Sequence, residues 1–335
     1  MSIIRPLEIG YVDAAFALAS AIKGEVMPIR ILIVGADVAS LSIQLNRLPC
    51  VLSVREQGRA LVIEIDHCSC DALGGLQAIR SAVTGMTAPT LRILGAGTIS
   101  PRPPSRRFST VALGHQAKIV THSDRKPASY TSCFFIIDHV PATSDSLTER
   151  IVNAVHVLAL GRRPISRSYS SVLVPVTVWP WTDDRPVSNL SSGFVSIVSR
   201  RNLECGQLND LVSAQFATGR QSRVQLLRRT SQFGRLPRPF WGLTRAVCRV
   251  LALPRETAVV SNLGTIRDSV LCSLGSVWFF TPPVRTREAV GIGLMKMEGT
   301  LTAVVSSYME PAEATTLGMR LWDLAGIRAT EFKVE

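Results

Sequence analysis

The stretch Ala60-Leu61-Val62-Ile63-Glu64-Ile65-Asp66-His67-Cys68-Ser69-Cys70-Asp71-Ala72-Leu73-Gly74-Gly75 combines a strand, a short loop and the start of a helix. The apolar run 60–66 follows the turn Gln57-Gly58 and predicts a strand. Apolar residues at helical spacing predict a helix over 73–83. His67 therefore lies at the end of a strand, and Asp71 lies where a helix begins.

This placement makes His67 and Asp71 candidate catalytic residues. A histidine held in a tight loop at a strand end is suited to general base catalysis, and a carboxylate four residues later can hold the loop shut or cap the helix. The same spacing is also typical of a structural histidine followed by a helix-capping aspartate. The motif by itself leaves both interpretations open.

Further strands and helices alternate irregularly around this stretch. Strands are expected over 29–34, 51–55, 132–140, 171–178, 194–199, 257–260, 277–281, 290–297 and 301–308. Helices are expected over 11–22, 38–48, 146–160 and 315–324, and over 208–251 with a break around 234–239. Gly35 starts no dinucleotide-binding fingerprint, because Asp37 and Ser40 stand where that motif needs glycines. The irregular order predicts an α/β sandwich of two subdomains rather than a doubly wound parallel sheet.

The composition of the chain indicates a linker between two subdomains, and it bears on membrane spans, secretion and metal sites. The proline- and arginine-rich segment 95–129 is the expected linker, with an N-terminal subdomain over 1–94 and a C-terminal subdomain over 130–335. The chain has no run of about 18 apolar residues, so no transmembrane helix is expected. The early apolar stretch 14–22 is short and lacks a basic region before it, so no secretory signal is expected. Seven scattered cysteines favour a reducing cytoplasm, and Cys68 and Cys70 lack the second Cys/His pair of a zinc site, so no metal is expected.

Positive charge is concentrated in one part of the chain. The formal net charge is +12, and residues 211–255 contain nine arginines and no acidic residue. Such a segment attracts phosphate or an acidic partner, or else forms a solvated basic face. Arg223, Arg228 and Arg229 are the candidate donor-binding residues. Few aromatic residues and no DNA-binding motif accompany them, so nucleic acid is not expected as a partner.

Landmarks elsewhere in the chain give the His67 motif its context. Val174-Pro175-Val176 follows it, then Asn189 before Gly193-Phe194-Val195, and then Ser261-Asn262-Leu263-Gly264 before a closing hairpin over 290–308. In this order the chain resembles the chloramphenicol acetyltransferase-like superfamily of acyltransferases, which includes the condensation domains of peptide synthetases. The chain has Asp66 and Ala72 where the family motif has a first histidine and a glycine, and Trp179 stands near the place of a family arginine.

The resemblance implies a fold and a reaction. The fold would be two chloramphenicol acetyltransferase-like α/β subdomains with an active site in a tunnel between them. His67 would be the general base in transfer of an acyl group from a CoA or phosphopantetheine-carrier thioester to an alcohol or amine. Ser261 or Asn262, expected in a turn, would bind the oxyanion. No permanently bound cofactor is implied, and the setting would be the bacterial cytoplasm and its secondary or lipid metabolism.

Two other functions and one other histidine stay open at this point. The fold could instead serve cyclisation or rearrangement of a carrier-bound intermediate, or a non-catalytic module that binds a carrier protein. Ile137-Asp138-His139 echoes Ile65-Asp66-His67, so His139 is a second candidate base. His115, His122 and His156 are expected at the surface.

Overall fold

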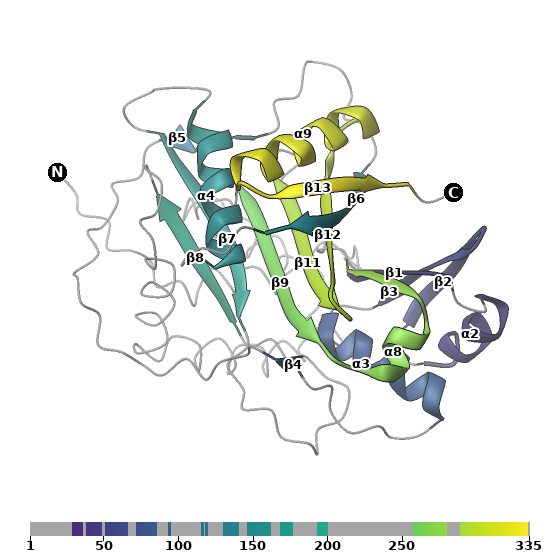
Figure 1. Ribbon diagram of the computed structural model, residues 1–335. Coiled ribbons are helices and arrows are strands. Elements are labelled where there is room, and N and C mark those ends of the chain that lie inside the picture. The colour runs from purple at the N-terminus through teal and green to yellow at the C-terminus, as the bar shows by residue number, and fades with distance from the viewer. Residues whose placement is uncertain are drawn as a thin grey trace, which may run out of the picture.

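The computed structural model describes residues 29–35, 38–48, 51–65, 72–85, 93–94, 115–116, 118–119, 130–140, 146–161, 168–176, 193–199, 257–279 and 289–333. Within these ranges the protein is a mixed α/β structure with two sheets (Figure 1). The expected helices over 11–22 and 208–251 lie outside the described residues.

The smaller sheet contains the strand that leads to His67. Its described strands are antiparallel, in the order β10 (Ser276–Phe279), β1 (Ile29–Val34), β3 (Ala60–Ile65) and β2 (Val51–Gln57). Alternate isoleucines of β1 and β3 bury one face against α2 (Val38–Leu45), α3 (Ala72–Thr84) and α8 (Ser269–Ser273). This apolar face also reaches Met295 and Met297, near the end of a strand of the larger sheet.

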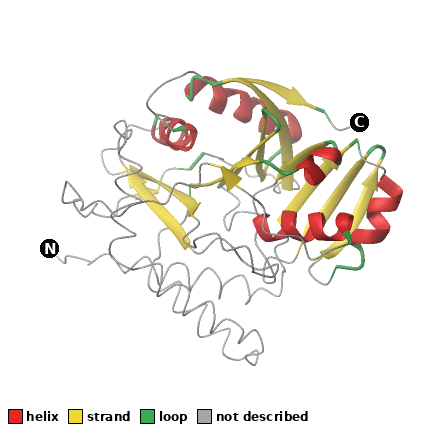
Figure 2. Ribbon diagram, turned by 60° about the horizontal axis from the view of Figure 1, so that its bottom comes forward, coloured by secondary structure: helices red, strands yellow, loops and turns green. Residues whose placement is uncertain are grey.

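The larger sheet is covered by two helices. Its described strands follow the order β13 (Arg328–Phe332), β6 (Tyr130–His139), β12 (Thr300–Tyr308), β11 (Val290–Met297), β9 (Ala258–Ile266), β7 (Ser168–Val176) and β5 (His115–Gln116). Two further strands flank this path, β4 (Ile93–Leu94) on β9 and β8 (Gly193–Ser199) on β7. One face packs on α4 (Leu147–Leu160) and α9 (Pro311–Leu324), and Figure 2 shows this helix layer apart from the helices of the smaller sheet.

The two sheets meet through the faces that these helices leave free. Leu32 and Trp278 of the smaller sheet are buried in one cluster with Val304 of the larger sheet. The Trp278 ring lies edge-on to Phe134, with 6.2 Å between ring centroids, and stacks on Phe332 at 4.5 Å. Strand β10 comes late in the chain yet pairs with β1, so the chain crosses between the sheets more than once. The boundaries at residues 94 and 130 stay a prediction.

Most expected elements are present, and the differences have physical causes. Helix α9 begins at Pro311 rather than near Thr315, because proline suits the first turn of a helix, where its missing N–H is not needed. Helix α8 and strands β4, β5 and β13 were not expected, and β5 lies within the segment 95–129 taken as the linker. The expectation for His156 was wrong: this residue lies on the buried side of α4 and has no exposed surface.

Candidate active site

The segment 66–71 connects the end of a strand to the start of a helix, as the sequence predicts. Ile65 is the last residue of β3 and pairs with Ile29, the first residue of β1, and with Val51, the first residue of β2. The end of β3 and the starts of its two neighbours therefore lie at the same edge of the sheet. Helix α3 begins at Ala72. His67 and Asp71 themselves lie outside the described residues, and so do Cys68 and Cys70.

Gly75 brings the two ends of this segment together. A Cβ atom at this position would lie only 2.6 Å from Cδ1 of Ile65 and 3.4 Å from Cδ1 of Ile31. Glycine inside a helix costs about 1 kcal/mol relative to alanine, and here it permits the first turns of α3 to approach the strand closely. The helix that follows the His67 segment is therefore seated directly on the last residue before it.

The first half of α3 is buried on every side, from Ala72 to Ile79. The next residue, Arg80, places its Nε atom 2.5 Å from Oδ2 of Asp268. Asp268 also caps α8, because its Oδ1 atom accepts hydrogen bonds from the backbone N–H groups of Val270 and Leu271. One carboxylate thus joins α3 to α8 and fixes the helix that carries the loop.

Ser261 and Asn262 do not form the expected turn, and the sequence prediction is corrected here. Both lie inside β9, which continues to Ile266. The turn signal corresponds to a bulge within the strand: Gly264 has a φ of 75°, and its N–H donates to Oδ1 of Asn262 at 2.9 Å. The pairing with β11 shifts register between Leu294 and Lys296, and the strand then resumes.

The two residues point to opposite faces of the larger sheet, because side chains alternate along a strand. Asn262 faces the helices, where its Nδ2 atom donates to Oγ1 of Thr148 at 3.0 Å. Ser261 is in register with Gly293, which is in register with Val304. Val304 packs against the smaller sheet, so Ser261 lies on the face shared by the two sheets and is 6% exposed.

A charged cluster at the end of β3 was not found from the sequence. Glu64 accepts hydrogen bonds from Nε of Arg30 (2.9 Å), Nη2 of Arg55 (2.7 Å) and Oγ of Ser53 (2.8 Å). Burial raises the pKa of Glu64, but the Ser53 hydrogen bond and the two guanidinium charges outweigh it and hold this pKa below its ordinary value. Cross-strand pairing of β1 and β2 with β3 is the signal that would have revealed the cluster.

Arg223, Arg228, Arg229 and Trp179 lie outside the described residues. Among the residues that are described, no group of three or more His, Cys, Asp or Glu side chains could hold a metal ion. No helix in that same part of the chain is long and apolar enough to cross a membrane.

Comparison with known proteins gives matches only at the level of structure. No protein-family model matches the chain, and no curated protein matches it in sequence. Among solved structures, it is similar to Fusarium sporotrichioides TRI101 complexed with coenzyme A and T-2 (13% identity, TM-score 0.47, covering 98% of this chain and 93% of that chain). It is also similar to the starter condensation domain of rhizomide synthetase RzmA (10%, 0.46, 94% and 94%).

A third match is polyketide synthase associated protein 5 from Mycobacterium tuberculosis (10% identity, TM-score 0.44, covering 92% of this chain and 97% of that chain). The matched structures include a condensation domain, an epimerization domain and an acetyltransferase. All are at low identity.

Proposed function

We propose that the protein is an acyltransferase that forms an ester or amide from a thioester, with His67 as general base. The observation that carries the proposal is the frame around residues 66–71. This segment starts where three strands of the smaller sheet end and finishes at a helix that Gly75 seats on Ile65. A side chain in such a segment has a scaffold fixed at both ends, which general base catalysis needs.

In the proposed reaction the imidazole of His67 removes a proton from the hydroxyl or amino group of the acceptor. The acceptor oxygen or nitrogen attacks the thioester carbonyl and forms a tetrahedral oxyanion. Collapse of this intermediate breaks the C–S bond, and the departing thiolate takes the proton from the imidazolium. Asp71 acts mainly on the loop and the helix start rather than on the substrate.

Ser261 is the better placed of the two candidate oxyanion donors. Its side chain lies on the face shared by the sheets, whereas the Asn262 amide is used by Thr148 and by the bulge at Gly264. A hydroxyl aimed at the developing negative charge stabilises the transition state more than the ground state. Asn262 then serves to hold the bulge that follows Ser261.

The acyl donor is proposed to be a CoA or carrier-protein thioester, and Arg223, Arg228 and Arg229 are proposed to bind its phosphate or acidic carrier. The active site would lie in a tunnel between the two subdomains. Asp66 and Ala72 depart from the acyltransferase motif and leave room for a second candidate, cyclisation or rearrangement of a carrier-bound intermediate.

The test is intact-mass detection of acyl transfer by the full chain, mixed with acyl-CoAs, acyl-carrier proteins and small alcohols or amines. His67→Ala should lower turnover by about 10²–10⁴-fold while folding is unchanged. His139→Ala is the matched control, because His139 also ends a strand but is expected to leave turnover within a few-fold.

Two outcomes would separate the alternatives. Turnover that survives His67→Ala and falls with His139→Ala would overturn the assignment of the base. Conversion of a carrier-bound substrate to a product of the same mass, lost in His67→Ala and without transfer to any acceptor, would instead support rearrangement.

A further inference from the structure

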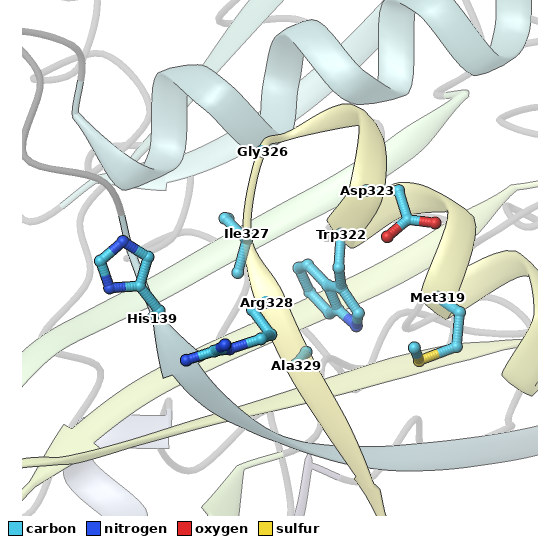
Figure 3. A pocket seen from close by; sticks show the side chains of 8 residues that line it. All are labelled: His139, Met319, Trp322, Asp323, Gly326, Ile327, Arg328 and Ala329. Atoms are coloured by element: carbon cyan, nitrogen blue, oxygen red, sulfur yellow. The ribbon is translucent and has the colours of Figure 1, made fainter.

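The described residues contain a cavity on the outer side of the larger sheet, at the edge strand β13. Its volume is about 560 Å³, within the range of roughly 300–1,000 Å³ found for small-molecule sites. It is lined by the end of β6, the C-terminal turns of α9 and the start of β13 (Figure 3). The lining residues are His139, Met319, Trp322, Asp323, Gly326, Ile327, Arg328 and Ala329.

The walls of the cavity are held by backbone contacts. Met319, Trp322 and Asp323 are three and four positions apart and so share one side of α9. Gly326, with a φ of 66°, turns the chain out of the helix, and the N–H of Ile327 donates to the Trp322 carbonyl at 2.8 Å. The chain then enters β13 with Arg328 paired in register with His139.

Three ionisable side chains of the wall have no partner among the described residues. His139, Asp323 and Arg328 are exposed, and none of them takes part in a side-chain hydrogen bond or ion pair in that part of the chain. Figure 3 shows the imidazole and the guanidinium on one side of the Trp322 indole and the carboxylate on the other. The cavity thus presents a cationic side and an anionic side.

The indole between them carries an unused donor. Trp322 has no exposed surface and packs edge-on to Phe135, with 5.7 Å between ring centroids. Its Nε1–H has no acceptor in the structure. Buried N–H groups are usually hydrogen-bonded, and this unsatisfied one belongs to a residue of the cavity lining, so its NMR signal can report on changes in the cavity.

We propose that this cavity binds a small amino acid-like carboxylic acid with an apolar body. The carboxylate would lie between Arg328 and His139, since charge-assisted hydrogen bonds to guanidinium are strong and directional. The apolar body would pack on Met319 and Ala329, and the amino group would be attracted by the Asp323 charge across the cavity without contacting it. This site is separate from the His67 segment, and the inference does not depend on the proposed reaction.

The test follows the indole N–H signals of the ¹⁵N-tryptophan-labelled full chain by NMR while L-phenylalanine is added. Trp322→Phe identifies the signal of Trp322, and that signal should move in a saturable way. Arg328→Gln should weaken binding by about tenfold or more, because one charged partner of the carboxylate is lost. Arg320→Gln, an exposed arginine of α9 outside the cavity lining, is the matched control and should leave binding unchanged.

Comparator ligands test the two charged sides separately. The deaminated analogue 3-phenylpropionate should bind more weakly than L-phenylalanine, and Asp323→Asn should remove that difference. Phenethylamine, which lacks the carboxylate, should bind far more weakly than either. A Trp322 signal that stays still at millimolar L-phenylalanine, or that moves equally in Arg328→Gln and Arg320→Gln, would overturn the proposal.

Discussion

Two hairpin–helix units in the molecule have the same order of elements. In the smaller sheet β2 and β3 are joined by the turn 58–59 and followed by α3, and in the larger sheet β11 and β12 are joined by the turn 298–299 and followed by α9. The units differ where the second strand passes into the helix. The first unit has the segment 66–71 at that junction, whereas the second has only Met309 and Glu310 before Pro311.

The difference shows where this scaffold has room for chemistry. A direct junction fixes the helix on the sheet and leaves few residues free to act. The longer junction has six residues, 66–71, between its strand and its helix. Its helix is held as closely as that of the second unit, because each helix has a glycine pressed against a strand side chain: Gly75 on Ile65 and Gly318 on Phe135. His67, the candidate base, therefore belongs to the unit with the longer connection between strand and helix.

The largest effect on stability is expected where the helix of the first unit is tied to its neighbour. Asp268→Ala removes the carboxylate that contacts Arg80 and caps α8, so it should lower the free energy of unfolding by about 3 kcal/mol. The corresponding tie in the second unit is a hydrogen bond from Thr315 to Glu331 at 2.8 Å, and Thr315→Val should cost only about 1 kcal/mol. Urea unfolding of both variants would measure this, and equal losses would contradict the ranking.

Acid should lower the free energy of unfolding through His156 of α4, a helix that packs on the larger sheet. Burial lowers the pKa of His156 to about 4, from an ordinary value of 6.5. The unfolded chain then binds more protons than the folded one between these values, so stability is complete above pH 6.5 and is lost as the pH falls toward 4. The loss at pH 5 should be about 2 kcal/mol.

Urea unfolding at a series of pH values would show this slope. His156→Leu should flatten it between pH 4 and 6.5, and His139→Gln, at an exposed site, should not. The Glu64 cluster contributes its own loss of stability only below pH 4.5, because its pKa is lowered from that value, so the two variants are compared between pH 4.5 and 6.5. A slope that persists unchanged in His156→Leu would contradict the assignment.

Gly75 and Gly318 occupy corresponding places in the two units, and the effect expected from substituting them is smaller. In Gly318→Ala the new Cβ would lie 2.4 Å from Cζ of the Phe135 ring, which packs on Trp322 and has little room to move. Overpacking should exceed the gain in helix propensity, leaving a net loss of about 1.5 kcal/mol. In Gly75→Ala the nearest atom is the end methyl of Ile65, which can rotate.

Gly75→Ala should therefore leave thermal stability almost unchanged but reduce acyl transfer, because Ile65 adjoins the His67 segment. Thermal unfolding and turnover of the two variants would be measured side by side. Loss of activity in Gly318→Ala without loss of stability would contradict this division of roles.

The smallest effect concerns the residues that precede the two helices. Asp71 directly precedes α3 and is expected to cap it, so Asp71→Ala should cost about 1 kcal/mol and lower turnover as the loop loosens. Glu310 precedes α9 but makes no side-chain cap hydrogen bond, so Glu310→Ala should leave stability unchanged. An Asp71→Ala protein that is inactive but fully stable would show that Asp71 acts in the chemistry itself.

The sequence predicted the strand and the helix on either side of the candidate site better than the contacts that hold these elements in place. Alternating apolar residues in β3 and helical spacing in α3 carry local information, and both elements lie within a residue or two of the expected bounds. The position of His156, four residues after Val152 and three before Ala159, also had a local signal, because this spacing places it on the buried side of α4. That signal was missed.

Other features depend on contacts between distant segments and had no local signal. The Arg80–Asp268 pair and the Glu64 cluster form only when separate strands and helices come together. The signal at Asn262-Leu263-Gly264 was wrongly taken for a turn, because pairing with β11 before and after it makes it a bulge within β9. A strand as short as β13 is stabilised by its pairing with β6 rather than by its own sequence.

Strand β10 has a consequence for how the chain is made. It pairs with β1, and Trp278 within it covers the back of the smaller sheet. During synthesis the edge of β1 stays unpaired until residues 276–279 have left the ribosome. Pairing of β1 with β10 joins residues that are far apart in the sequence, and such contacts form slowly. An exposed strand edge with apolar flanks is prone to aggregation. Fragments that end before Ser276 should therefore be poor candidates for separate expression.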